Sequence, residues 1–230
     1  MQRPMRGLRG ASATEAFRAI RELIVNGSLA AGARLVETDL SERLGLSRTP
    51  VRAALQRLRE EGYVREKGGQ RQSRLFVSPL STEDASELYY LLGELDGMAA
   101  HFAAALPAAS RQALTARLRA LNGRLREAAG DGHPDGEVYF TLDADFHRTY
   151  HEAADRPRIQ AFLKAIRPQA ERYVRAYTDA FASAEIPRSA AEHDRIVEAI
   201  ERGDPEAAHE AARVNYRNAA LRLWRVIGGG

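Results

Sequence analysis

The stretch LSRTPVRAALQRLREEGYV, residues 46–64, decides how the first third of the chain folds. Ser47 is a favoured helix N-cap, and Pro50 falls in the first turn, where its missing N–H costs no hydrogen bond. The residues that follow place an apolar side chain at every helical turn, at Val51, Leu55 and Leu58. This pattern predicts a helix from Ser47 to about Glu61 with one face turned to a core.

A second, shorter helix is expected immediately upstream, near Glu37–Leu44, and Gly45-Leu46 then forms the turn between the two. Two short helices joined by a three-residue turn that contains glycine are typical of a helix-turn-helix. Farther upstream, Thr14 and Asn26 bound a first helix. Its apolar stripe consists of Ala16, Ile20, Leu23 and Ile24.

The outer face of the third predicted helix begins with polar and basic residues: Ser47, Arg48, Thr49 and Arg52. An arginine in the first turn of a recognition helix can bond guanine bidentately, and a threonine can meet a thymine methyl group or a phosphate. The helix N-terminus also favours a phosphate. These residues are therefore candidate DNA contacts, and the alternative is a set of solvated helix arginines.

After this helix the chain predicts a two-stranded wing. An apolar run at 63–65 is followed by Gly68-Gly69 among basic residues, and a second apolar run occupies 74–77. A glycine pair at the tip lets the backbone approach a duplex closely.

Charge divides the chain in the same place. Residues 1–80 carry 15 Lys and Arg against 8 Asp and Glu, whereas residues 81–230 carry 19 against 23. A basic small part joined to a slightly acidic larger part suggests that the first part meets a polyanion.

The stretch from Ala16 to Pro79, and above all residues 46–64, resembles the winged-helix domain of the GntR family of bacterial regulators. Carried over by position, the resemblance implies DNA contacts at Arg34, Thr38, Ser47, Arg48, Thr49, Arg52 and Gly69. Thr38 stands where some members carry an arginine, and Gly68 where one branch carries a histidine, so we transfer no sequence preference from those positions. The arginines of the basic tail (Arg3, Arg6 and Arg9) form either a minor-groove arm or a disordered segment.

From Thr82 onward, apolar stripes at helical spacing predict six helices, which are separated at residues 131–134, Arg156-Pro157, Pro187 and residues 203–205, with a further break after the first stripe. Short links between them favour an antiparallel bundle. The expected chain is mainly α: a tail at 1–12, a winged helix-turn-helix of three helices and a two-stranded wing at 13–79, and an all-α six-helix bundle at 80–230.

Polar residues on the inward faces of this bundle form a second candidate site. Asp143 and His147 are four residues apart and share a helix face. His193 begins the fifth predicted helix, and Asn215 follows 22 residues later. This order resembles the FCD effector domain of the FadR branch of GntR regulators over about residues 83–225, and six helices rather than seven favour the VanR-like subgroup.

The FCD resemblance implies a divalent transition metal such as Zn, Ni or Mn, because metal-containing members supply an acidic residue and three histidines. The matching positions are Asp143, His147, His193 and, as a weaker ligand, Asn215, which offers only an amide oxygen. Leu92 stands where many members carry an arginine for an acidic ligand. His151 is either a substitute ligand or a surface residue. A metal-free polar pocket remains the alternative.

The sequence thus predicts a dimeric, ligand-controlled transcriptional regulator, most simply a repressor, that binds double-stranded operator DNA and responds to an organic or sugar acid. A metal-dependent enzyme and a nonspecific nucleic-acid-binding protein are the other hypotheses. The sequence has no HExxH, G-x-x-x-x-G-K, G-x-G-x-x-G or G-x-S-x-G motif, which disfavours the enzyme. The absence of cysteine and of an apolar run of membrane length or a secretory signal is consistent with a cytoplasmic, nucleoid-associated protein.

Overall fold

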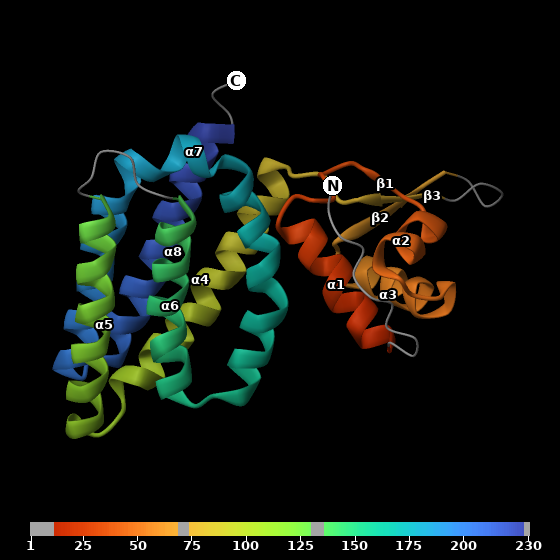
Figure 1. Cartoon of the computed structure of the whole chain (residues 1–230). Coiled ribbons are helices and arrows are strands. Elements are labelled where there is room, and N and C mark those ends of the chain that lie inside the picture. The colour runs from red at the N-terminus through yellow and green to blue at the C-terminus, as the bar shows by residue number, and fades with distance from the viewer. Residues whose placement is uncertain (1–11, 69–73, 130–135, 228–230) are drawn as a thin grey trace. The chain divides into compact units, whose positions relative to one another are not determined.

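A computed structural model describes residues 12–68, 74–129 and 136–227. The chain divides into two compact units, Met1–Leu80 and Ser81–Gly230. Figure 1 labels their helices and strands. Each unit has its own buried apolar core. We call the first unit the winged-helix domain and the second the helical domain.

The winged-helix domain is built from α1 (Ala13–Val25), β1 (Arg34–Leu35), α2 (Glu37–Leu44), α3 (Arg48–Glu60), β2 (Val64–Lys67) and β3 (Arg74–Val77). The first helix starts earlier than Thr14, because Ser12 and Glu15 form a reciprocal capping box. Gly45 ends α2 with a φ of 67°, a left-handed conformation that favours glycine. The helix-turn-helix therefore forms where the sequence predicts it.

The wing contains one strand more than the sequence predicts. β3 lies between β1 and β2 and pairs antiparallel with both, so that Arg34 faces Phe76 and Arg65 faces the same Phe76 from the other side. β1 is only two residues long and follows a turn, so it lacks the length from which alternation can be recognised. The pairing places Arg34, which is exposed, on the outer strand of the sheet.

The helical domain consists of α4 (Thr82–Ala104), α5 (Ala108–Ala129), α6 (Gly136–Ala154), α7 (Pro157–Arg202) and α8 (Pro205–Ile227). The sequence predicts two helices where α7 is one, because we placed a boundary at Pro187. The helix continues through Pro187, so the described part of the domain has five helices rather than six. The assignment to the VanR-like subgroup loses the helix count on which it rested.

The 46 residues of α7 would span about 69 Å if the helix were straight. Figure 1 instead shows α7 bent, with one limb rising along the bundle and the other descending. Pro168 and Pro187 both lie inside it, and an interior proline removes a backbone hydrogen bond and bends a helix. The two limbs thus occupy the places of the two predicted helices.

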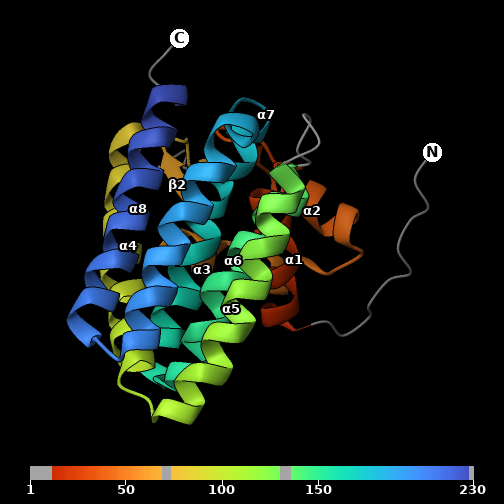
Figure 2. The same cartoon turned by 90° about the vertical axis from the view of Figure 1, so that its left-hand side faces the viewer.

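Close packing of α4 against α8 forms the centre of the helical domain, and Figure 2 shows these two helices side by side. A Cβ at Gly97 of α4 would lie 2.9 Å from the imidazole Cδ2 and 3.0 Å from the backbone oxygen of His209 of α8, so the two helices approach closely at this glycine. α7 contacts both helices and α5 as well. The interior therefore receives side chains from helices that are far apart in the sequence. No helix in the described part of the chain has the length and apolar character needed to span a membrane.

Candidate functional site

The candidate recognition face of the winged-helix domain is the exposed side of the first turn of α3, with Ser47, Arg48, Thr49 and Arg52. Val51, Ala54, Leu55 and Leu58 are buried on the inner side of this helix, which fixes its rotation. Ser47, Arg48, Thr49 and Arg52 are consequently exposed on the outer side. Ser47 caps α3 by its backbone conformation without a side-chain cap hydrogen bond. The structure therefore brings these four predicted residues together on one solvent-facing surface.

Arg52 is held by a partner that the sequence analysis did not identify. Its Nε lies 3.1 Å and 3.2 Å from the two carboxylate oxygens of Glu37, and one Nη lies 3.0 Å from Oε2. The Arg52 side chain is still 71% exposed. Glu37 sits in the first turn of α2, where an acidic residue is expected for helix stability alone, so nothing in the sequence indicated this second role.

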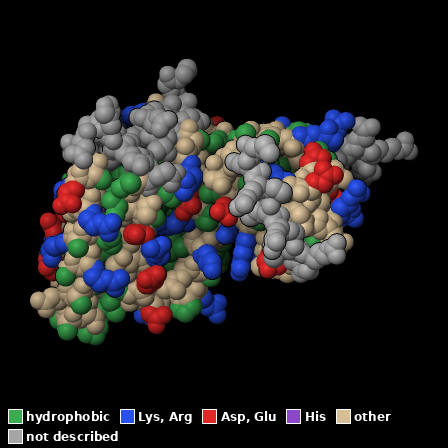
Figure 3. All heavy atoms as spheres, viewed as in Figure 1, with side chains coloured by type: hydrophobic (Ala, Val, Ile, Leu, Met, Phe, Trp, Pro, Cys, Tyr) green, Lys and Arg blue, Asp and Glu red, His purple; other side chains and the backbone are tan. Residues whose placement is uncertain are grey.

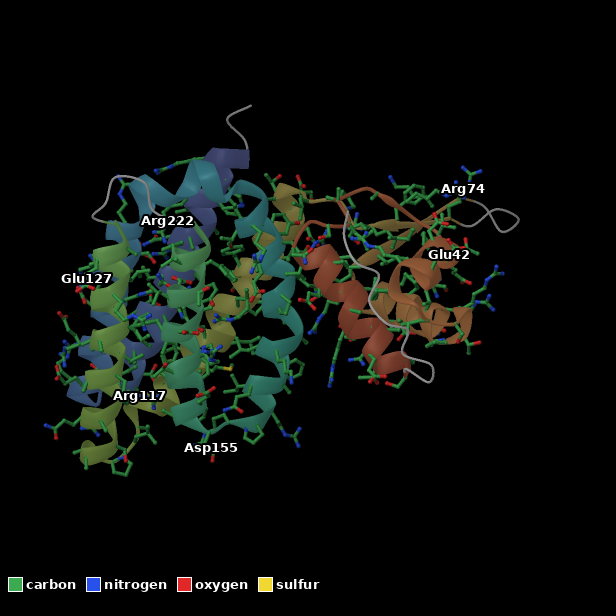
Figure 4. The ribbon with its side chains drawn as sticks, viewed as in Figure 1. Glu42, Arg74, Arg117, Glu127, Asp155 and Arg222 are labelled. Carbon is green, nitrogen blue, oxygen red and sulfur yellow. The ribbon has the colours of Figure 1, made fainter. Side chains whose placement is uncertain are left out.

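The other predicted DNA contacts lie on other elements or outside the described residues. Arg34 is exposed on β1, and Thr38 of α2 is partly buried and donates a hydrogen bond to Asp39 at 3.2 Å. Arg74, which was not among the predicted contacts, is the first residue of β3 (Figure 4). Gly69 and the tail arginines (Arg3, Arg6 and Arg9) lie outside the described residues.

The second candidate site is a cavity of about 70 Å³ inside the helical domain. Its lining is mixed, with aromatic, acidic, basic and amide side chains: Tyr89, Leu92, Tyr139, Phe140, Asp143, Ala144, His147, Arg167, Ala170, Glu171, Val174, Ser189, Asn215, Tyr216, Ala219 and Arg222. A cavity of this size and polarity has room for several water molecules or a small polar ligand. The outer surface over α5 and α6 also carries basic and acidic side chains, and Figure 3 shows the two kinds interspersed there without a patch of one sign.

Three of the predicted metal ligands come together in the helical domain: Asp143 and His147 line this cavity, and His193 approaches Asp143 without being part of the lining. His147 Nε2 lies 4.0 Å from Asp143 Oδ2, and His193 Nε2 lies 3.4 Å from Asp143 Oδ1. Both histidines are buried, whereas Asp143 is partly accessible. Ligand atoms of the three residues all lie within 4.8 Å of one another, so the group is able to hold a metal ion.

The chemistry of these atoms fits a cation. His193 Nε2 is buried and makes no well-formed hydrogen bond among the described residues; its contact with Asp143 Oδ1 is 3.4 Å long, and a cation between the two atoms would satisfy both. Burial would raise the pKa of Asp143, but His193, His147 and Arg167 outweigh that effect and lower it to about 2. Burial also lowers the pKa of His193, which favours the neutral imidazole that metals require.

The fourth predicted ligand, Asn215, is hydrogen-bonded to a different side chain, Glu192. Asn215 Nδ2 donates to Glu192 Oε2 at 2.9 Å. Asn218 and Arg222 each donate to Glu192 Oε1 at 2.8 Å. Oδ1 is the only atom of the Asn215 side chain with a lone pair that can bind a metal ion. Arg222, which Figure 4 labels, lines the cavity. Leu92 lines it too, and only 1% of its surface is exposed.

A buried ionic network lies behind His147, and the sequence analysis missed its centre. Asp96 is fully buried, and its carboxylate accepts from Tyr150, lies 3.1 Å from His147 Nδ1 and lies 2.5 Å from His151 Nε2. Burial opposes its ionisation, yet His147 and His151 hold the pKa of Asp96 well below its usual value. His151, which we left open as a ligand or a surface residue, is buried in this network.

Asp96, His147 and His151 also stand close enough to bind an ion, but their arrangement disfavours one. The histidine nitrogens and the Tyr150 hydroxyl already surround the carboxylate, and the Arg167 guanidinium lies 3.6 Å from it. A cation here would meet an adjacent positive charge and displace existing hydrogen bonds. We therefore interpret this group as a supporting network.

Comparison with known proteins identifies both domains. The model of the bacterial regulatory proteins of the gntR family matches residues 12–72, and the FCD domain model matches residues 87–218. An HTH-type transcriptional regulator of Streptomyces ambofaciens is 31% identical over 202 residues, covering 86% of this chain and 79% of that protein. A probable D-xylose utilization operon transcriptional repressor of Paenarthrobacter nicotinovorans is 29% identical over 194 residues, covering 82% of this chain and 78% of that protein.

Two solved structures share the fold. E. coli McbR/YncC superimposes with a TM-score of 0.70 at 21% identity, covering 93% of this chain and 97% of its own. A GntR-type transcriptional regulator from Rhodococcus sp. RHA1 has a TM-score of 0.66 at 24% identity and covers 92% of this chain and 96% of its own. At these identities the likeness concerns the fold alone.

Proposed function

Because this chain belongs to the GntR family of bacterial regulators and carries an FCD domain, we propose that it is a ligand-responsive repressor that binds operator DNA through α3 and the wing. The observation that carries the proposal is the exposed first turn of α3 on a rigidly packed helix. Arginines in this position can bond guanine bidentately, and the helix N-terminus favours a phosphate. The protein named as a xylose-operon repressor supports repression rather than activation.

The experiment begins with duplexes selected from a random-sequence library by the wild-type protein. We expect Arg48→Ala and Arg52→Ala to lose most of their affinity for the selected duplex, whereas Arg18→Ala, an exposed arginine on α1, keeps it. A wild-type protein that selects no common sequence would contradict specific recognition and favour nonspecific nucleic-acid binding. Full affinity in both α3 variants would mean that the recognition helix is assigned wrongly.

In the helical domain, the proposal is a divalent transition ion held by Asp143, His147 and His193, with Asn215 as a weaker oxygen ligand. The buried Nε2 of His193, which makes no well-formed hydrogen bond, and the ionised Asp143 beside it support a cation in this position. Two imidazoles and a carboxylate suit Zn, Ni or Mn, and the ion would leave coordination positions open for an effector. A metal-free polar pocket is the alternative that the experiment must separate.

Elemental analysis of the purified protein and zinc titration against a competing chelator test the metal site. We expect His147→Ala and His193→Ala to lose zinc binding, while His101→Ala, a partly exposed histidine of α4, retains it. Equal zinc binding in all three variants would mean that zinc binds elsewhere and that this cavity is a metal-free polar pocket. Turnover of a small acid by the zinc-loaded protein would instead support the enzyme hypothesis, which the regulator names of the relatives do not favour.

The effector is proposed to be a small organic or sugar acid. Arg167 and Arg222 line the cavity beside the candidate metal ligands, so an acid could meet both a cationic side chain and the ion. To act as inducer, the acid must bind one arrangement of the protein better than the other. A panel of acids should raise the unfolding temperature and release selected DNA in parallel. An acid that stabilises the protein without releasing DNA would contradict its role as inducer.

The protein is proposed to act as a homodimer in the cytoplasm, in association with the nucleoid. Exposed apolar side chains on one face of α4 support self-association through the helical domain: Tyr90 is 69%, Leu91 49% and Met98 46% exposed. Light scattering should give a dimer mass for the wild type and a monomer mass for Tyr90→Glu with Leu91→Glu. Unchanged dimers in this variant would locate the interface elsewhere.

A further inference from the structure

The two histidines of the candidate metal site share a feature that the family resemblance does not supply. Each has its Nδ1 directed at an oxygen of a buried partner, while its Nε2 faces Asp143. A neutral imidazole carries a proton on one nitrogen and a lone pair on the other, and the partner of one nitrogen sets the state of both. The Asp143 carboxylate could also accept a proton from either Nε2, but it lies at 4.0 Å and 3.4 Å, whereas the Nδ1 contacts are 2.8–3.2 Å long. The shorter contacts favour the proton on Nδ1 and leave the Nε2 lone pair for a metal.

For His147 the partner is the Asp96 network. Its Nδ1 lies 3.1 Å from Asp96 Oδ2 and 2.8 Å from the Tyr150 hydroxyl oxygen. The Tyr150 hydroxyl donates its single proton to the same Asp96 oxygen. Both groups that face Nδ1 thus present lone pairs to it, so Nδ1 must supply the proton.

For His193 the partner is Asn122 of α5. The Asn122 Nδ2 donates to Ala190 O and to Asp194 Oδ1, both at 2.8 Å, which fixes the orientation of the amide group. Its Oδ1 then lies 3.2 Å from His193 Nδ1 and accepts a hydrogen bond. Asn122 is only 1% exposed, and the His193 ring is stacked on Phe146 at a centroid distance of 3.9 Å. The ring therefore has little freedom to rotate.

We propose that Asp96 and Asn122 are positioning residues that hold His147 and His193 in the same tautomer, protonated at Nδ1, so that both Nε2 lone pairs face Asp143. This inference rests on the proposed metal site. A preset pair of lone pairs reduces the reorganisation that binding requires. Such outer partners of metal-bound histidines commonly change affinity by about 10–100-fold when they are removed.

The test separates the tautomers from the metal. Long-range ¹H–¹⁵N spectra of the histidine rings, recorded on metal-free protein at mildly alkaline pH, distinguish a protonated nitrogen from a bare one. We expect Nδ1–H for both histidines in the wild type. In Asp96→Asn the new amide can donate to His147 Nδ1, so the proton of His147 should move to Nε2. In Asn122→Leu the preference of His193 should disappear.

Zinc titration of the same proteins provides the second readout. Asp96→Asn and Asn122→Leu should each bind zinc about 10–100-fold more weakly than the wild type. Asp145→Asn, the same change at a partly exposed position of α6, should bind it equally well. If Asp96→Asn fails to fold, the wild-type spectrum and Asn122→Leu still decide the question.

The two proposals fail in different ways. A wild-type protein with both protons on Nδ1 that binds no zinc would support the positioning role and overturn the metal site. A wild-type protein that binds zinc but has a proton on Nε2 of either histidine would overturn the positioning role and keep the metal site. Unchanged tautomers and zinc affinity in both variants would also overturn it.

Discussion

The candidate recognition face of α3 and the acid–histidine cluster of the helical domain (Asp143, His147 and His193, with Asp96 behind them) differ in how their functional side chains are held. Arg48 and Arg52 are exposed, and the opposite side of the same helix, α3, is buried and entirely apolar. His147 and His193 are buried, and hydrogen-bonded partners from other helices surround them. A site for a macromolecule must remain on the surface, whereas a site for a small ligand can be enclosed. Substitutions should therefore separate function from stability in the first region and couple them in the second.

The largest expected effect tests this coupling at Asp96. Asp96→Ala leaves His147, His151 and Arg167 buried without their shared carboxylate, so the helical domain should lose about 3–5 kcal/mol of stability. The only tryptophan, Trp224, lies in α8, and its fluorescence reports the unfolding of this domain in urea. A loss below about 1 kcal/mol would show that the network contributes little and that the two regions are less different than we argue.

The partners of the cluster also show what the sequence could predict. Asp143 and His147 share a helix face and were found from their spacing, and His193 came with the family resemblance. Asp96 and Asn122 lie 51 and 71 residues away from the histidines that they contact. Helical periodicity describes only the neighbours of a residue on its own helix, and these contacts depend on how α4 and α5 pack against α6 and α7. The sequence pattern therefore predicted the candidate ligands but not the residues that contact them from other helices.

In the winged-helix domain almost everything was predictable, because its signals are local. The capping residues, the glycine of the turn and the apolar stripe of α3 lie within a few residues of one another. The sequence analysis did not predict the pairing of β1 with β3 or the ion pair of Glu37 with Arg52, because both join segments that are distant in the sequence. The long helix α7 was missed for a different reason, since we treated Pro187 as a helix end although an interior proline can also bend a continuing helix.

The second prediction concerns the support beneath the recognition face. Leu58 is fully buried in the core of the winged-helix domain, so Leu58→Ala should cost about 2–5 kcal/mol. DNA binding should be lost through unfolding of this domain, which circular dichroism would detect. Zinc binding by the helical domain should persist, because the two units have separate cores. Loss of both activities together would show that the domains do not fold independently.

The third prediction separates function from stability on the same helix. Arg48→Ala should weaken binding to a selected duplex by about 1–3 kcal/mol, as expected for one arginine that reads a guanine. The unfolding midpoints of both domains should not change, because the side chain is exposed. Calorimetry without DNA and fluorescence anisotropy with DNA give the two values. A variant that loses stability as well as affinity would remove the contrast between the two regions.

The smallest expected effect tests the pair formed by Glu37 and Arg52. An exposed ion pair contributes at most about 1 kcal/mol to stability, so Glu37→Gln should leave the unfolding midpoint nearly unchanged. The carboxylate nevertheless holds the Arg52 guanidinium in one orientation and places a negative charge beside the surface that would meet phosphates. Its removal should therefore strengthen binding to random DNA while it leaves Arg52 less well oriented.

The quantity to measure is the ratio of affinities for a selected and a random duplex at fixed salt, because affinity alone mixes charge with sequence reading. We expect Glu37→Gln to lower this ratio, and Glu42→Gln, an exposed acidic residue later in α2, to leave it unchanged. An unchanged ratio in Glu37→Gln would mean that the exposed pair only neutralises charge. A lowered ratio would show that even the exposed region depends on a positioned partner, as the buried cluster does.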